Sequence, residues 1–196
     1  MMKLYVARHG ETKLNKKRVY QGWVDSGLNE EGIKHCEEIR DKLSSITFDV
    51  VITSPLKRAV QSAEIITGTP YSKLITCDAF KELNFGLWEA MHYKEIEKSY
   101  PLEWNLWSED WVNYTIPQGE SFNMFYNRIE QGLKNMLEEY KDSTVLLVSH
   151  EGTLKVITTL LLDLGIEYYW RFNFQFGTYS EFHVTDDMTM IKKLNS

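Results

Sequence analysis

Residues 4–12 read Leu4-Tyr5-Val6-Ala7-Arg8-His9-Gly10-Glu11-Thr12, and the rest of the chain is organised around this stretch. Its apolar half predicts a buried strand, which stops at a cation, an imidazole and a glycine. Gly10 allows the backbone to turn and to approach a ligand closely. The next two residues begin a predicted helix, whose N-terminus offers N–H groups without partners. Strand, turn and helix start therefore predict an anion site that contains a nucleophile, His9.

Strand and helix patterns alternate along the rest of the chain. Strands are expected over residues 48–53, 74–77 and 144–149, with a terminal hairpin formed by 177–185 and 188–194. Helices are expected over residues 29–43, 54–67, 121–140 and 152–164. This alternation predicts an α/β layer fold with a mainly parallel sheet.

Two of these helices have clear local signals. Asn29 is a predicted N-cap, and the helix after it is expected to bury a stripe of four side chains, Ile33, Cys36, Ile39 and Leu43. Ser54-Pro55 predicts the start of the next helix, with serine as the cap and proline as the first helical residue. The helix over 152–164 is expected to turn Leu160 and Leu164 inward.

Polar residues stand where three of the predicted strands end. Arg8 and His9 follow the first strand, Arg58 lies in the first turn after the second, and His150 follows the strand over 144–149. Taken alone, Arg58 is better interpreted as a solvated surface arginine. Because ligand sites in parallel sheets form outside the carboxyl ends of the strands, these residues are expected to converge on one crevice.

Two arginines and two histidines suit a phosphoryl group. Arginine binds phosphate oxygens in a bidentate manner, and a neutral imidazole can attack phosphorus to form a phosphohistidine. Glu82 lies in the loop over 80–89 among apolar residues, which would keep it protonated as the donor to the leaving group. No fingerprint of a nucleotide-binding loop is present, so no cofactor is expected.

The segment over 91–118 contains short helical patterns and many aromatic residues, Trp107 and Trp111 among them. It is interpreted as a helical insertion within a single domain that spans residues 1–196. Its aromatic residues form a small core of their own, contact a bulky and partly apolar substrate as a lid, or do both.

Composition sets outer limits on function. The 196 residues are 43% hydrophobic and carry a net charge of −6, which argues against nucleic-acid or anionic-membrane partners. Cys36 and Cys77 are expected to be free thiols. No signal-peptide pattern or membrane span is visible, so a cytoplasmic protein is expected. The sequence leaves the assembly open, a homodimer included.

Several motifs occur in the order that one known family shows. They are Arg8-His9-Gly10-Glu11-Thr12 with Asn15, Gln21-Gly22, Ser54-Pro55-Leu56-Lys57-Arg58-Ala59, Glu82 before Phe85-Gly86-Leu87-Trp88-Glu89, and Val148-Ser149-His150. On these residues the chain resembles the histidine phosphatase (phosphoglycerate mutase-like) superfamily over nearly its whole length.

The resemblance implies a three-layer α/β/α sandwich, a phosphohistidine at His9, and a phosphate pocket made of Arg8, Arg58 and His150. It also implies Glu82 as proton donor and no metal. Polar substrate contacts are implied for three further residues, Asn15, Gln21 and Gly22. The substrate is then a small phosphate ester.

A closer likeness is to the α-ribazole-5′-phosphate phosphatases of cobalamin biosynthesis. It rests on Phe85-Gly86 with Trp88-Glu89, Trp107 with Asp110-Trp111, Pro117 with Gly119-Glu120, and Trp170. Two positions depart from the pattern of the superfamily. Glu151 stands where many relatives have glycine, so its carboxylate either repels a phosphate dianion, points away, or contacts a sugar hydroxyl. Ala90 stands where Trp-Glu is often followed by glycine.

Other functions remain as alternatives. A broad-specificity histidine phosphatase or a mutase-like enzyme would use the same residues. A metal site would pair His9 with Glu11 and His150 with Glu151, but it would place a metal cation beside arginines. A non-catalytic phosphate-binding module would not need the complete set of candidate catalytic side chains.

Overall fold

A computed structural model describes residues 1–196 and contains one six-stranded sheet. The strands are β1 (Met2–Arg8), β2 (Val50–Thr53), β3 (Ile75–Thr76), β4 (Thr144–Ser149), β5 (Tyr179–Val184) and β6 (Thr189–Lys193). They lie in the order β3-β2-β4-β1-β5-β6. The first four in that order are parallel, and β5 and β6 add an antiparallel hairpin beside β1. The prediction of a mainly parallel sheet is confirmed.

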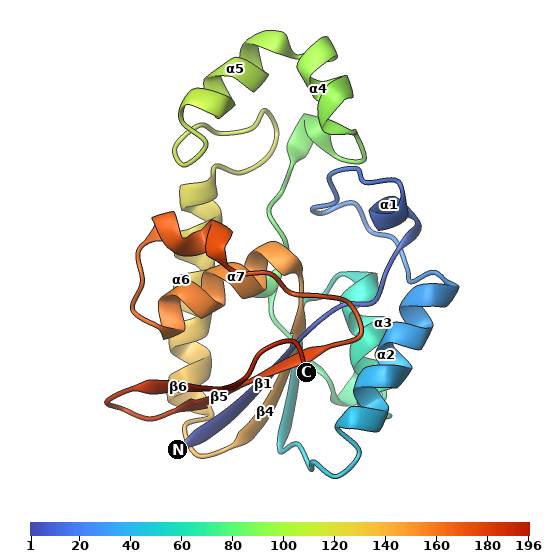
Figure 1. Ribbon diagram of the computed structural model, residues 1–196, viewed down its shortest axis with the longest axis vertical. Coiled ribbons are helices and arrows are strands. Elements are labelled where there is room, and N and C mark those ends of the chain that lie inside the picture. The colour runs from blue at the N-terminus through green and yellow to red at the C-terminus, as the bar shows by residue number, and fades with distance from the viewer.

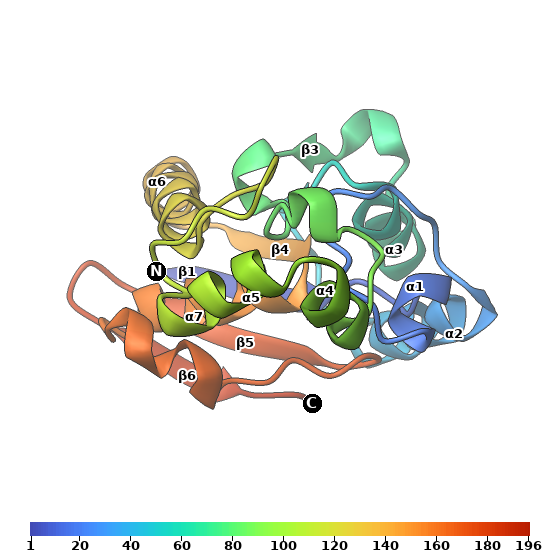
Figure 2. The same cartoon turned by 90° about the horizontal axis from the view of Figure 1, so that it is seen from above.

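Helices cover both faces of this sheet. They are α1 (Lys13–Lys16), α2 (Glu30–Lys42), α3 (Lys57–Thr67), α4 (Tyr93–Ser99), α5 (Pro101–Glu109), α6 (Phe122–Glu139) and α7 (Glu151–Leu161). Figure 1 shows α2 and α3 on one side of the sheet and α6 and α7 on the other. The fold is therefore the expected three-layer α/β/α sandwich. Figure 1 shows α4 and α5 above the carboxyl ends of the parallel strands, and Figure 2, seen from that side, shows them in front of the sheet.

The alternation of side chains along the central strands creates two cores. In β4, Val145 and Leu147 belong to the core under α6 and α7, whereas Leu146 and Val148 belong to the core under α2 and α3. All four are fully buried. Successive residues of a strand point to opposite faces, so a strand covered on both sides is apolar at every position.

Helix α3 begins later than the Ser54-Pro55 signal predicts. Its first residue is Lys57, and its N-cap is Leu56, which makes no side-chain capping bond. The Ser54 hydroxyl instead lies 2.8 Å from Nε2 of His150. The predicted start was wrong, because regular helix begins only at Lys57; the Ser54 hydroxyl accepts the N–H of Leu56 at 3.3 Å and is shared with His150.

Gly10 is required by packing against a helix. A Cβ atom at Gly10 would lie 2.1 Å from the carbonyl oxygen of Gly32 in α2, and a Cβ at Gly32 would lie 2.1 Å from that of Glu11. Gly32 thus takes a place on the buried side of α2, and Ile33 is 42% exposed rather than buried as expected. The close approach that Gly10 permits is to α2.

Smaller differences concern the ends of elements. β3 covers only two residues, because it pairs with β2 alone at the edge of the sheet. α7 begins at Glu151, directly after its N-cap His150, and Leu160 and Leu164 are only partly buried. Cys36 and Cys77 are free thiols, as expected, although Cys77 is only partly buried. None of the helices combines the length and apolar character needed to cross a membrane.

The helical segment over 91–118 shares the core of the main body. Its buried residues Ile96 and Ile116 belong to the same cluster as the side chains of β1 and β4 that face α6 and α7. Trp88 is 1% exposed and lies 5.9 Å from Trp104 and 6.0 Å from Trp107, ring centre to ring centre. The segment therefore does not have a separate core.

Candidate active site

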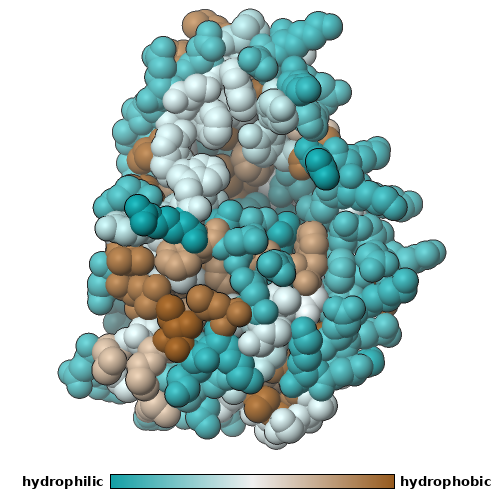
Figure 3. All heavy atoms as spheres, in the orientation of Figure 1, coloured by the Kyte–Doolittle hydropathy of each residue, from teal (hydrophilic) through white to brown (hydrophobic).

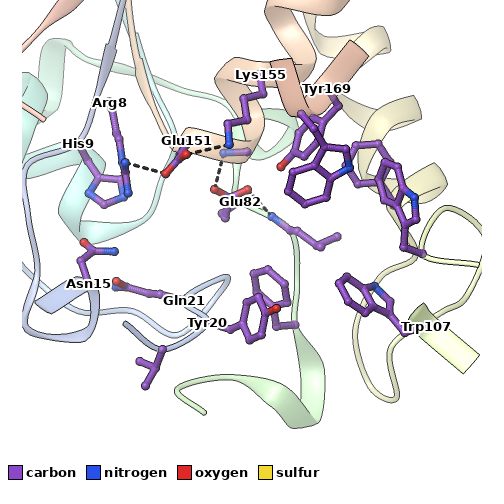
Figure 4. Close-up of a pocket in the computed structure, with 17 residues that line it drawn as sticks. Arg8, His9, Asn15, Tyr20, Gln21, Glu82, Trp107, Glu151, Lys155 and Tyr169 are labelled. Carbon is purple, nitrogen blue, oxygen red and sulfur yellow. Dashed lines mark hydrogen bonds and ion pairs between the residues drawn. The ribbon is translucent and has the colours of Figure 1, made fainter. Parts of the chain in front are cut away.

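A pocket of about 270 Å³ lies between the carboxyl ends of the parallel strands and the helical segment. Figure 3 shows the surface hollowed below α4 and α5. One end of the pocket is polar and is lined by Arg8, His9, Asn15, Gln21, Glu82 and Glu151. The other end is aromatic and is lined by Tyr20, Phe85, Trp107, Trp111, Tyr169 and Trp170. Figure 4 shows labelled members of both groups turned toward the same space.

His9 presents an unprotonated nitrogen to its surroundings. It follows β1, and its Nδ1 lies 2.7 Å from the carbonyl oxygen of Gly10. A carbonyl can only accept, so Nδ1 carries the proton and Nε2 carries the lone pair. Burial, followed by the charges of Arg58 and Arg8, lowers the pKa of His9 well below 6.5. The imidazole is therefore neutral at neutral pH.

Arg58 lies against Nε2 of His9 and joins this ring to His150. The Nε–H group of Arg58 points at Nε2 of His9 (3.3 Å) and at Nδ1 of His150 (3.2 Å). Since Nδ1 of His150 accepts, its Nε2 donates to the Ser54 hydroxyl. Burial and the charge of Arg58 lower the pKa of His150 well below 6.5 as well. Burial first, and the charge of the same arginine second, keep both imidazoles neutral.

Backbone carbonyls hold the far end of the Arg58 side chain. Its Nη1 donates to the carbonyl of Val24 at 3.1 Å, and its Nη2 donates to that of Gly22 at 2.6 Å. Arg58 is fully buried, so it is not the surface arginine that its isolated position suggests. Burial lowers its pKa to about 10, which leaves it charged at neutral pH. Arg58 and His150 lie beside His9 and are not among the residues that line the open pocket.

Arg8 is fixed on one side and unpartnered on the other. Its Nη1 donates to the carbonyl of Phe174 at 3.0 Å and pairs with Oε2 of Glu151 at 2.7 Å. The guanidinium carbon also lies 3.9 Å from the centre of the Phe176 ring. Nε is buried without a partner, and no protein atom bonds Nη2. These two nitrogens form the edge with which a guanidinium binds an oxyanion in a bidentate manner.

Glu82 lies at the floor of the pocket beside the N-terminus of α7. Its Oε2 accepts the N–H of Gly152 at 2.9 Å, and its Oε1 accepts the N–H of Leu83 at 3.0 Å. Burial raises the pKa of Glu82 and outweighs these two donors and Arg58, all of which favour the carboxylate. The group is thus biased toward the protonated form.

Asn15 and Gln21 line the pocket, whereas Gly22 does not. The Oδ1 atom of Asn15 accepts from the backbone and hydroxyl of Thr12, so its amide nitrogen is available to a ligand. The N–H of Gly22 donates to Glu89, and a Cβ there would lie 1.9 Å from the carbonyl oxygen of Leu83. Gly22 shapes the loop that holds Arg58 rather than facing the pocket.

Local sequence patterns did not single out several residues of the site, among them Lys155, Phe176, Tyr20 and Tyr169. Lys155 lines the pocket, and its Nζ lies 2.8 Å from Oε1 of Glu151. The spacing of four residues after Glu151 on a predicted helix is a signal that would have found it. Phe176 carries no such signal, because it reaches Arg8 from a loop near the C-terminus.

A neutral imidazole with an unprotonated nitrogen, set beside arginines and a buried carboxyl, is the arrangement expected of an enzyme that transfers phosphoryl groups through a histidine. Comparison with known proteins gives the family. The chain belongs to the histidine phosphatase superfamily (branch 1), whose family model matches residues 4–196. The resemblance to this superfamily is thereby confirmed.

Several relatives match the chain over its whole length. It is 31% identical over 195 residues to phosphoserine phosphatase 1 of Hydrogenobacter thermophilus, covering 100% of this chain and 92% of that protein. It is 27% identical to the adenosylcobalamin/α-ribazole phosphatase of Escherichia coli, covering 100% and 96%. The crystal structure of the α-ribazole phosphatase of Shigella flexneri superposes with a TM-score of 0.93 at 29% identity, covering 100% and 96%.

Proposed function

We propose that this phosphatase cleaves phosphomonoesters in two steps, with His9 as the covalent carrier. Nε2 of His9 attacks phosphorus, the bond from phosphorus to the ester oxygen breaks, and Glu82 gives its proton to that oxygen. Glu82, now a carboxylate, takes a proton from water, which attacks the phosphohistidine and releases phosphate. The observation that carries this proposal is the fixed tautomer of His9, which leaves Nε2 unprotonated.

Fixed charges stabilise the transition state in this proposal. The unpartnered edge of Arg8 binds two oxygens of the phosphoryl group, and the amide of Asn15 adds a donor. Arg58 and His150 lie beside Nε2 of His9: Arg58 supplies positive charge next to the reacting nitrogen, and its bond to Nε2 orients the ring before attack. Arg8 and Asn15 need not reorganise during the reaction, whereas the bond from Arg58 to Nε2 must break for Nε2 to attack phosphorus.

We further propose that the substrate is a phosphate ester with a flat aromatic group, and that α-ribazole 5′-phosphate is the physiological one. The aromatic end of the pocket supports this. Trp111 lies 5.5 Å from Trp170 and 6.2 Å from Tyr169, ring centre to ring centre, so several rings are clustered where a benzimidazole would stack. Phosphoserine, the substrate in the name of one relative, has no apolar group to fill this space.

Two measurements test the proposal. Brief exposure to a ³²P-labelled ester is expected to give a phosphoprotein that is labile in acid and stable in base, and His9→Ala is expected to abolish it. A label on serine or on a carboxyl group would contradict the role of His9.

A screen ranked by kcat/KM is expected to place α-ribazole 5′-phosphate above phosphoserine and 3-phosphoglycerate. A flat ranking would instead indicate a broad-specificity phosphatase.

A further inference from the structure

Glu151 lies between two cations at the start of α7. Its Oε2 is 2.7 Å from Nη1 of Arg8, and its Oε1 is 2.8 Å from Nζ of Lys155. Figure 4 shows this chain of contacts along one wall of the pocket. The side chain of Glu151 is 30% exposed and that of Lys155 is 13% exposed. The carboxylate therefore does not point away from the polar end.

The charge of Lys155 removes the difficulty that a carboxylate creates beside a phosphate dianion. Arg8 and Arg58 both lie close to the position of the phosphoryl group. Without Lys155, the negative charge of Glu151 would cancel one of these two positive charges. Because Lys155 balances Glu151, the polar end keeps the net effect of both arginines. The contact with Nη1 also leaves Nε, on the opposite edge of Arg8, without a protein partner.

The pair formed by Glu151 and Lys155 lies where the two ends of the pocket meet. Nζ of Lys155 is 5.5 Å from the ring centre of Tyr169 and 5.8 Å from that of Trp170. A substrate with its phosphate near Arg8 and its ring among the aromatic residues must pass its linking group along this pair.

We propose that Glu151 and Lys155 determine specificity by binding hydroxyl groups on the part of the substrate that links the phosphate to the aromatic group. A hydroxyl donates to the carboxylate and accepts from the ammonium, so a sugar with neighbouring hydroxyls satisfies both. A charged linking group gains less binding free energy, because one member of the pair attracts it and the other repels it. The inference rests on the proposed function and narrows its substrate class to aromatic ribosides phosphorylated on the sugar.

The test compares α-ribazole 5′-phosphate with its 2′,3′-dideoxy analogue. A hydrogen bond to a charged group contributes about 1.5–3 kcal/mol. The wild type is therefore expected to prefer the hydroxylated substrate by roughly tenfold or more in kcat/KM. In the variant Glu151→Leu with Lys155→Met this preference is expected to fall to about twofold or less. Because a ratio of two substrates is compared, a general loss of activity cancels.

Single substitutions test the charge balance. Lys155→Met leaves Glu151 uncompensated and is expected to raise KM for every ester, phenyl phosphate included, with a smaller change in kcat. Adding Glu151→Gln is expected to recover most of that KM. Lys192→Met, an exposed lysine of β6, is the matched control and is expected to leave kinetics unchanged.

The outcomes separate this inference from the proposed function. A wild type that hydrolyses both ribosides equally, or a double variant that keeps the full preference, overturns the role of the pair and leaves the proposed substrate standing. A wild type that hydrolyses phenyl phosphate but neither riboside overturns the proposed substrate and this inference with it.

Discussion

Replacing Glu82 with glutamine separates proton donation to the leaving group from the attack of His9 on phosphorus. The substitution keeps the size of the side chain and removes the proton that would be transferred. General acid catalysis contributes roughly 10²–10⁴ in rate, which corresponds to about 3–5 kcal/mol of barrier. For an ester with a strongly basic alkoxide leaving group, such as α-ribazole 5′-phosphate, kcat/KM is therefore expected to fall by about 10²–10⁴.

The size of the fall in kcat/KM depends on the basicity of the leaving group. Nitrophenolate leaves without a proton, so hydrolysis of nitrophenyl phosphate by Glu82→Gln is expected to fall by only about tenfold or less. The assay is a series of aryl and alkyl phosphates of graded leaving-group basicity, measured under identical conditions. The wild type is expected to show a shallow dependence on basicity and the variant a steep one.

The stability of the Glu82→Gln variant must be measured together with its activity. Both oxygens of Glu82 accept backbone N–H groups, and the glutamine amide nitrogen would face one of these donors. An unsatisfied buried donor costs about 1–3 kcal/mol, so a lower Tm is expected and activity is to be assayed well below it. Glu138→Gln, at an exposed position of α6, serves as control. An equal loss on alkyl and nitrophenyl esters would refute the assignment of Glu82 as proton donor.

Three further predictions concern stability and binding. Ala90 has a φ of +60°, where an L-residue is strained, so Ala90→Gly is expected to stabilise the fold by about 0.5–1 kcal/mol in urea unfolding; a destabilised variant would contradict this. The pKa values of His9 and His150 are lowered in the fold, so the unfolded state binds more protons below about pH 6.5 and stability falls as pH falls through this range, by up to about 1.4 kcal/mol per pH unit for each histidine. His9→Gln is expected to reduce that slope, and an unchanged slope would mean that His9 titrates normally. Phe176→Leu removes the ring against Arg8, and a cation–π contact of about 0.5–2 kcal/mol predicts a KM raised about 2- to 30-fold; an unaltered KM would show that the ring does not hold the guanidinium.

Local patterns were sufficient where neighbouring residues decide the outcome. The apolar runs of β1 and β4 and the long amphipathic stripe of α6 were predicted close to their observed bounds. They were predictable because burial of a strand or a helix face depends on a repeat within a few residues. The same patterns failed at the helix start after Ser54, whose hydroxyl is shared with the distant His150, and at Ile33, because the backbone after Gly10 packs against Gly32.

The sequence by itself determined the class of fold, and it placed a histidine and arginines at the ends of parallel strands. It also indicated the family, because these motifs keep their order along the chain. Only the tertiary structure decided which nitrogen of His9 is unprotonated, that Arg58 is buried and bonds both histidines, and that Lys155 compensates Glu151. The physical reason is that a motif fixes which groups are present, whereas protonation and charge balance depend on atoms a few ångströms away that come from remote parts of the chain.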